Sequence, residues 1–323
     1  MDDVHILSDL EQNRDLISES QYYKNFKFKI EKLMDFLDSL STLIFENGKI
    51  ITCISGTKMH ILQTELIDSA IRTLVSIKSC CIYGNFSDAN ALTRKYRDDL
   101  ILFLFILGVL NNRQYLSEEQ IREAVGDGID IDKWITIIEL TINIAVSGNA
   151  KNCNDRCVDA WFDDNVNNLT WSQKRNLSFE NYMTYLKTNA SINEIIVNYN
   201  LEKNWEKIRQ KLNDYTHNNG RTYTRHNLIT INSPDVKNCF KEITSRLEFI
   251  TSVFVVFLIL IDSTFIGSTD YVDHLDMDVE PPEDSQYWIA PFIHEFIDKY
   301  INTINPELKM FLKLNNKYGM LID

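Results

Sequence analysis

The chain has 323 residues, of which 44% are hydrophobic and 11% aromatic, so it can bury a sizeable core and is not an intrinsically disordered protein. Only 10 glycines and 5 prolines leave few turns for a sheet protein with many hairpins, which favours helices. The formal net charge of −13 excludes broad nonspecific binding to nucleic acid, although a local basic patch could still contact RNA.

The first residues and the cysteines indicate the cellular location. The start Met1-Asp2-Asp3-Val4-His5 is acidic and has neither the basic nor the apolar region of a signal peptide. The six cysteines are scattered through a long chain instead of being packed into a small secreted frame, so we expect reduced thiols in a cytoplasmic protein. They lie at positions 53, 80, 81, 153, 157 and 239.

The first elements expected along the chain are long amphipathic helices. Apolar residues recur at steps of three and four over residues 22–45, which predicts a helix there. The short β-prone run 50–54 has no visible partner, so we interpret it as an extended linker or the edge of a minor hairpin. Further helices are expected over 61–83, which stops at Gly84, and over 88–111, whose second half is nearly all apolar and must be buried on most sides.

The middle of the chain is predicted to contain shorter helices and a polar excursion. Ser117 begins a capping box, and another helix is expected over 131–146. Residues 149–177 are rich in Asn, Asp and Lys and are the best candidate for a domain boundary. The chain then divides into an N-terminal helical region 1–148, the polar excursion, and a C-terminal helical region 178–323, unless it forms one continuous domain.

The last part of the chain is again predicted to be helical. Residues 218–232 are expected to be loop, with extended runs at 222–224 and 228–231, and Ser233 followed by Pro234 is a strong start signal for a long helix to residue 261. The other helices are expected over 179–187, 192–199, 201–216, 286–303 and 306–317. The whole pattern predicts an all-α fold, a multi-helix bundle with long antiparallel helices and little or no sheet.

Two apolar runs could be mistaken for membrane spans. They cover residues 100–110 and 253–261, and the second extends raggedly to Ile266. Both uninterrupted runs are shorter than the roughly 20 residues that a spanning helix needs. We therefore expect buried core helices and no membrane partner, with membrane association through residues 249–266 as the alternative.

The most informative motif is a charged helix that ends in a histidine. Arg209, Asn213 and His217 are spaced i, i+4, i+8, so they form a stripe on one face, and Gly220 can close the helix in the left-handed conformation. A histidine near a helix C-terminus titrates near neutrality and suits acid–base catalysis. Arg209 could stabilise phosphate charge, and Asn213 could orient the imidazole. The alternative is that His217 only satisfies the last carbonyl groups.

A second charged turn precedes the buried half of the 88–111 helix. Arg94 and Asp98 form an i, i+4 pair, and Arg97 lies on nearly the same face as Arg94. These residues could line a cleft, or they could be a solvated helix face whose ion pair contributes little.

Two clusters contain side chains that can bind metals, but each lacks part of a site. Cys153 and Cys157 are half of a zinc site at best, because no second pair of Cys or His has matching spacing. The Asp276-Met277-Asp278 run lacks the glycine and the terminal glutamate of a calcium loop. We therefore expect no metal and no other cofactor.

Two separated pieces of the chain are similar to a group of bacterial helical proteins. One is Asp88-Ala89-Asn90-Ala91-Leu92-Thr93-Arg94 with Arg97-Asp98-Asp99-Leu100, and the other is Leu212-Asn213-Asp214-Tyr215-Thr216-His217. Together they resemble the HEPN superfamily, which implies an α-helical bundle and, in active members, RNA-cutting toxins and phage-defence effectors. In the catalytic pattern of that family, four to six residues separate an arginine from a histidine. Seven separate Arg209 from His217, and four separate Arg221 from His226.

The resemblance implies a metal-independent ribonuclease that acts as a homodimer. In that mechanism His217 is the general base on a ribose 2′-hydroxyl, and Asn213 orients it. Arg209, Arg94 or Arg97 then supplies the charge that stabilises the phosphorane. RNA is the expected partner.

The alternative is a catalytically inert helical interaction module. Its binding surface is the acidic loop 270–284, which lies near Tyr271, Tyr287 and Trp288. Such a loop suits a protein partner that carries basic groups.

Overall fold

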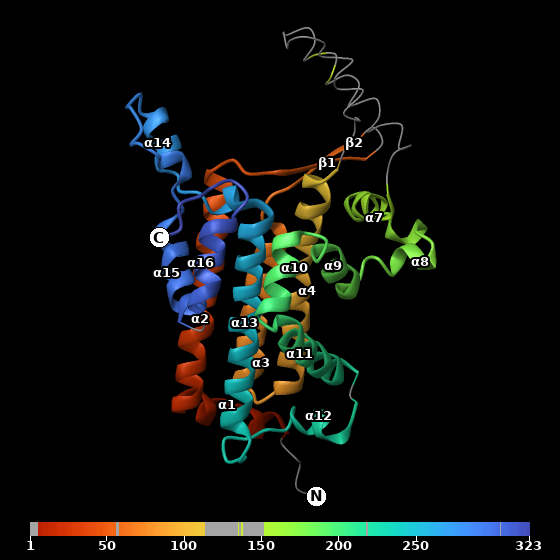
Figure 1. Ribbon diagram of the computed structural model, residues 1–323. Coiled ribbons are helices and arrows are strands. Elements are labelled where there is room, and N and C mark those ends of the chain that lie inside the picture. Colours follow the sequence, from red (N-terminus) through yellow and green to blue (C-terminus); the bar gives the residue numbers. More distant parts are fainter. Residues whose placement is uncertain are drawn as a thin grey trace, which may run out of the picture. The chain divides into compact units, whose positions relative to one another are not determined.

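The fold is helical, as the sequence predicts (Figure 1). The computed structural model describes residues 6–55, 58–113, 135, 137, 152–217, 219–303 and 305–323. Within these ranges the only sheet is one two-stranded hairpin, so the all-α multi-helix prediction is confirmed.

The chain forms two compact units, and neither is continuous in sequence. Unit 1 contains Met1–Lys49, Thr64–Phe103 and Lys187–Asp323, and unit 2 contains Ile50–Gln63 and Leu104–Leu186. The division expected at residues 148 and 177 stays a prediction, because residues 138–151 lie outside the described part of the chain.

Unit 1 begins with two helices, α1 (Ile6–Glu19) and α2 (Gln21–Glu46). Ser20 caps α2, since its side chain accepts a hydrogen bond from the backbone N–H of Tyr23. The apolar residues of α2 that recur at helical spacing are buried, and α2 packs against α3 and α13. The helix expected over 22–45 is therefore confirmed.

The next two helices are joined by a tight turn. They are α3 (Glu65–Ile82) and α4 (Phe86–Asn111), and Gly84 between them has a left-handed backbone with φ of +76°. The apolar second half of α4 is almost fully buried, as expected. The predicted start of α3 at residue 61 is wrong, because residues 58–62 form a strand.

Unit 2 is built on a hairpin and on the end of α4. Strands β1 (Ile51–Ser55) and β2 (Lys58–Leu62) pair antiparallel, with Cys53 opposite His60. The hairpin interpretation of residues 50–54 is therefore the right one. The remaining elements of unit 2 are α7 (Cys153–Phe162), η1 (Val166–Asn168), α8 (Trp171–Lys174) and α9 (Phe179–Leu186).

Two predictions for the middle of the chain are changed or fall outside the described residues. The polar run 149–177 contains helix α7, because Asn152 and Asp155 form a reciprocal capping box and Cys157 and Val158 bury one face. The capping box at Ser117 lies outside the described residues, and so does the 131–146 helix apart from positions 135 and 137, which are helical.

The C-terminal part of unit 1 differs from the prediction at four places. Residues 221–225 are helical instead of loop. The long helix begins at Val236 and not after Ser233, whose hydroxyl accepts from Thr230 N–H instead of capping. The acidic loop contains a helix, and the helix expected from residue 286 begins only at Pro291 because Ile289 forms a bridge with Gly267. The elements are α10 (Ala190–Asn198), α11 (Leu201–Thr216), α12 (Arg221–Arg225), α13 (Val236–Asp262), η2 (Ser263–Ile266), α14 (Asp270–Asp276), η3 (Ser285–Tyr287), α15 (Pro291–Phe296), η4 (Ile297–Asn302) and α16 (Pro306–Asn315).

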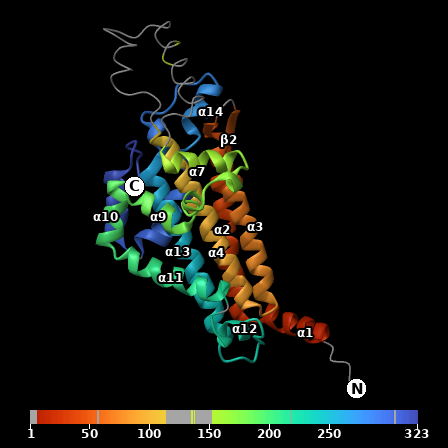
Figure 2. The same ribbon diagram turned by 90° about the vertical axis from the view of Figure 1, so that its right-hand side faces the viewer.

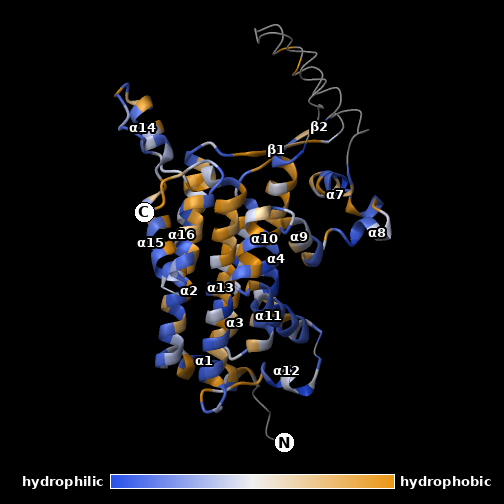
Figure 3. Cartoon of the chain, in the orientation of Figure 1, coloured by the Kyte–Doolittle hydropathy of each residue, from blue (hydrophilic) through white to orange (hydrophobic). Residues whose placement is uncertain are grey.

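Helix α13 is the central element of unit 1, and it is apolar along most of its length (Figure 3). Near its start, Phe240 contacts Phe26 of α2 and Phe86 of α4, with ring centroids 5.2 and 4.9 Å apart. Among the described residues, Val236–Ile266 is long and apolar enough to cross a membrane, and an 18-residue window within it has a mean hydropathy of 2.4. This is weak evidence for a span, because 83% of that apolar window is buried inside the protein, as in a core helix.

Candidate anion-binding groove

Helix α11 presents an apolar stripe to unit 1 and a charged face to solvent. Trp205, Leu212 and Tyr215 are its buried residues, and their spacing of seven and three places them on one side of the helix. Trp205 packs on Phe249 of α13, with ring centroids 5.7 Å apart. The other positions of α11 are mostly charged or amide side chains, so the surface between α11 and α13 carries polar groups over an apolar floor.

A groove with a volume of about 510 Å³ lies between α11 and α13. Ile208 and Phe249 supply apolar surface, and Lys207 and Lys241 are exposed on it. The remaining lining residues are Asn204, Asn238, Glu242, Ser245 and Arg246. Three cations and one carboxylate therefore line this groove, so its net charge is positive whereas that of the whole chain is negative.

Arg246 is the buried cation of the groove. Its residue is only 8% exposed, and its guanidinium donates to Glu242 on the same helix and to the side-chain oxygen of Asn90 on α4. The guanidinium carbon also lies 5.9 Å from the ring centroid of Tyr215. These contacts hold the charge of Arg246 in a fixed position between the groove and the end of α11.

A histidine and a tyrosine form a hydrogen bond beside Arg246. The hydroxyl of Tyr215 and Nδ1 of His226 are 2.8 Å apart. Burial raises the pKa of Tyr215 to about 12, and burial, followed by the charge of Lys211, lowers the pKa of His226 below 6.5. Burial therefore favours the neutral form of the imidazole. When Nδ1–H donates to the tyrosine oxygen, Nε2 carries the lone pair of a general base.

The turn after α12 joins this histidine to the start of α4. The carbonyl of His226 accepts from Phe86 N–H at 2.9 Å. Asn227 accepts from the N–H groups of Ser87 and Asp88 and donates to the Asp88 carboxylate, so it caps α4 from 140 positions away. The start of α4 is therefore bonded to the turn after α12, and Tyr215 of the 212–217 piece is linked to it through His226 and through Arg246.

The three residues of the predicted α11 stripe are not joined in one constellation. His217 is exposed, and its ring makes no hydrogen bond with another described side chain. Arg209 donates to both carboxylate oxygens of Glu206, at 2.8 and 2.6 Å, so its charge is already engaged. Asn213 accepts through its backbone carbonyl from His217 N–H. His217 therefore bonds a carbonyl group at the end of α11, as in the alternative that gives it no catalytic role.

The arginines of α4 form a local ion cluster. Arg97 is 1% exposed and donates to Asp98 through Nε and Nη2, at 2.8 and 2.6 Å. Arg94 lies 3.7 Å from the other oxygen of the same carboxylate. No hydrogen bond or ion pair in the described part of the chain joins either arginine to His217. The residue of α4 that does reach the groove is Asn90, through Arg246.

No group of three or more potential ligand side chains that could hold a metal ion is found among the described residues. Cys153 accepts from the amide of Asn176 at 2.7 Å, and Cys157 is buried with its pKa raised to about 11 by burial. Neither contact adds a ligand to the half-site that the sequence suggests.

Comparison with known proteins gives no relative. No family model, curated protein or solved structure matches this chain. The HEPN resemblance therefore stays a prediction, and the site is interpreted from its own geometry.

Sequence reasoning missed Tyr215, Arg246 and Lys241 as site residues, and it placed His226 in a loop. A signal for His226 was present, because four residues separate it from Arg221, but the β-prone run Thr222–Thr224 suggested an extended segment. The local structure is helical because Tyr223 donates to Asp214 and His226 bonds Tyr215, which holds α12 against α11.

Unit 2 contains a second polar cluster that the sequence did not reveal. The side chain of Arg113 is 2% exposed, and it pairs with Asp155 and Asp159 at 3.0 Å each. Cys53 donates to Asp159, and burial raises its pKa to about 12. The cluster fastens α7 to the hairpin and to the end of α4, and its charges are mutually satisfied.

Proposed function

We propose that this protein binds single-stranded RNA in the groove between α11 and α13 and cuts it without a metal. The observation that carries the proposal is the local reversal of charge around a neutral histidine. Residues 201–246 contain nine Lys and Arg against five Asp and Glu, a net charge of +4 in a chain of −13. Such a concentrated basic segment attracts a polyanion although the whole chain repels it.

The groove supports binding of a phosphate chain over an apolar floor. Lys207 and Lys241 are exposed at the end of flexible stems, and can each neutralise one phosphate. Phe249 offers an aromatic surface for a base. Two phosphate contacts give a salt dependence of about −1.4 in log K against log salt for a single strand.

His226 is the residue that we propose as the general base. It accepts the proton of a ribose 2′-hydroxyl at Nε2, the 2′-oxygen attacks the adjacent phosphorus, and the bond to the 5′-oxygen breaks. The 5′-oxygen takes up a proton from water and leaves, so the products are a 2′,3′-cyclic phosphate and a 5′-hydroxyl. Tyr215 positions the imidazole, and Arg246 supplies positive charge near the phosphorane.

The HEPN resemblance adds a cellular role to this proposal. It implies a cytoplasmic toxin or phage-defence effector that acts as a homodimer. Under this proposal His226, which four residues separate from Arg221, replaces His217 as the histidine of the family pattern.

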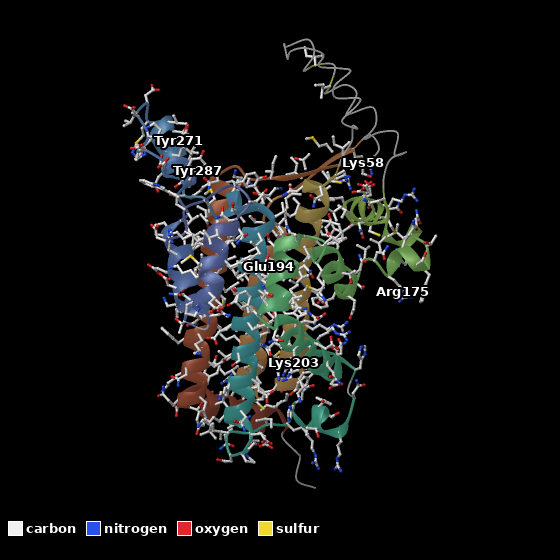
Figure 4. The ribbon with its side chains drawn as sticks, viewed as in Figure 1. Lys58, Arg175, Glu194, Lys203, Tyr271 and Tyr287 are labelled. Carbon is white, nitrogen blue, oxygen red and sulfur yellow. The ribbon has the colours of Figure 1, made fainter. Side chains whose placement is uncertain are left out.

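Binding is tested by fluorescence anisotropy with a labelled single-stranded RNA at several salt concentrations. We expect the variant Lys207→Glu/Lys241→Glu to lose at least about tenfold in affinity and most of its salt dependence. Lys203→Glu is the matched control, because Lys203 is an exposed lysine of α11 that belongs to the basic segment but does not line the groove, so its loss is expected to weaken binding much less (Figure 4). Equal affinities of the three proteins would remove the groove from the proposal.

Cleavage is tested on the same RNA in the presence of a chelator. We expect His226→Ala to lose cleavage by about 10² to 10⁴-fold while it keeps RNA affinity. His217→Ala is expected to cleave like the wild type. The opposite ranking of the two variants would return the base to His217, and absence of cleavage by the wild type would leave RNA binding alone.

A second candidate function is protein binding through the acidic segment 270–284. Exposed apolar side chains favour it, because Leu275 and Met277 are 50% and 64% exposed within this segment.

A further inference from the structure

Residues 270–284, which we call the acidic segment, contain α14 and combine exposed apolar side chains with acidic ones. Val272, Leu275, Met277 and Val279 are 41%, 50%, 64% and 52% exposed. Seven carboxylates accompany them and no lysine or arginine does. They belong to Asp270, Asp273, Asp276, Asp278, Glu280, Glu283 and Asp284.

The base of the acidic segment is fastened to the rest of unit 1. Ser268 N–H donates to the carbonyl of Trp288 at 2.8 Å, and Ala290 N–H donates to the carbonyl of Ile266 at 3.0 Å. Within the segment, Val279 N–H bonds the carbonyl of His274 and closes the end of α14. The exposed side chains are therefore presented in a fixed arrangement, which lowers the entropy cost of binding.

The groove between α11 and α13 has the complementary composition. Lys207 and Lys241 line it together with the apolar side chains of Ile208 and Phe249. A neighbouring cavity of about 200 Å³ shares Asn204 and Phe249 with the groove. Its lining is mainly apolar, with Leu201, Val253, Val256, Ile301 and Leu308. An acidic segment with protruding Leu and Met side chains matches both the charge and the apolar surface of this region.

The acidic segment of one chain does not meet the groove of the same chain. α14 and α11 lie toward opposite ends of unit 1 in two perpendicular views (Figures 1 and 2). Tyr271 and Tyr287 mark the α14 end and Lys203 marks α11 (Figure 4). We propose that the groove receives the acidic segment of a second copy of this chain. The contact joins two different surfaces, so it is heterologous and can build chains or rings, and it is separate from the homodimer that the HEPN resemblance implies.

This inference rests on the proposed role of the groove as a site for an anionic chain, and it adds regulation to that role. The acidic segment of the second copy and an RNA strand compete for Lys207 and Lys241. RNA therefore dissociates the assembly, and the assembly keeps the groove closed when RNA is absent.

Charge reversal on each side tests the contact by sedimentation velocity at low salt over a range of protein concentrations. The segment variant is Asp273→Lys/Asp276→Lys, and the groove variant is Lys207→Glu/Lys241→Glu. All four residues are exposed, so we expect both proteins to fold, which circular dichroism checks. The wild type and the Lys203→Glu control are expected to associate, and each charge-reversed variant alone to associate at least about tenfold more weakly.

An equimolar mixture of the two variants gives the decisive measurement. The reversed segment of one variant meets the reversed groove of the other, so we expect association to return in the mixture. A wild type that stays monomeric, or a mixture that stays as weak as its components, overturns the inference. RNA binding by the segment variant is measured separately. If it is retained while self-association is absent, only this inference fails, and if the wild type associates without binding RNA, only the proposed function fails.

Discussion

Replacing Gly84 by alanine tests whether the turn between α3 and α4 is held by a close approach of two backbones. Gly84 has φ of +76°, and a Cβ added there would lie 2.0 Å from the carbonyl oxygen of Ile229. Ordinary contact begins at 3.4 Å, so the carbonyl would have to move by more than about 1 Å. That carbonyl accepts from Asn13, whose own side-chain oxygen accepts from Ile231 N–H. The substitution therefore disturbs the loop that leads from α12 to α13.

Gly48 is the matched control, because it has φ of +60° and an added Cβ would meet no atom within 4 Å. A left-handed alanine costs about 1–2 kcal/mol, partly offset by the lower entropy of the unfolded chain, and this cost is common to both sites. Gly84→Ala adds overpacking of about 1–3 kcal/mol and a weakened hydrogen bond of about 1 kcal/mol. We therefore expect Gly84→Ala to lose about 2–4 kcal/mol more than Gly48→Ala.

The assay is urea unfolding followed by far-UV circular dichroism, with amide hydrogen exchange at residues 85–90 as a local measurement. Gly84→Ala is expected to lower the unfolding midpoint well below that of Gly48→Ala and to speed exchange at the start of α4, where Asn227 and His226 bind. Equal midpoints for the two variants, with unchanged exchange, would refute the close approach of Gly84 and Ile229.

Two further predictions concern charges. Burial holds the pKa of His226 in the folded protein below its unfolded value of 6.5. Its contribution to stability is therefore present above pH 6.5 and is lost as the pH falls through the folded pKa. We expect the urea midpoint to fall between pH 7 and pH 5, and to fall less in His226→Gln. A midpoint loss of the same size in both proteins would contradict this. Arg113→Met leaves Asp155 and Asp159 without their buried cation and is expected to lower the free energy of unfolding by about 3–5 kcal/mol. The triple variant Arg113→Met/Asp155→Asn/Asp159→Asn is expected to regain most of this loss. Arg175→Met, at an exposed arginine, is the control and is expected to lose under about 1 kcal/mol. Single and triple variants of equal stability, measured by urea unfolding, would exclude the charge explanation.

The fold was predictable where a helix buries a single stripe of regularly spaced apolar side chains. The spacing of Phe26, Ile30 and Leu33 specifies α2, and the apolar end of α4 indicates burial before any partner is known. The hairpin was only half predictable, since Ile61 and Leu62 fit a helical stripe as well as a strand that pairs with β1. Helix α12 was missed because its Thr and Tyr residues favour strands, and tertiary contacts to Asp214 and Tyr215 override that preference.

The candidate site was less predictable because its residues meet through long-range contacts. Periodicity places Arg209, Asn213 and His217 on one face, but it says nothing about which partner each side chain finds. In the structure Arg209 is engaged by Glu206, whereas Arg246 reaches Asn90, 156 positions away. Contacts of that kind depend on the packing of α4, α11 and α13, which a single sequence does not encode in any local pattern.

The interrupted sequence of unit 1 has a consequence for how the chain folds during synthesis. Helix α2 packs on α13, but α2 ends at residue 46 and α13 begins at residue 236. Unit 2 is complete by residue 186, so it can fold while α1, α2, α3 and the first half of α4 still lack α13. The apolar faces of those early helices stay uncovered until the ribosome has released α13. We therefore expect the nascent chain to expose apolar surface over this interval, and a truncation before α13 to yield an aggregating fragment instead of a smaller folded protein.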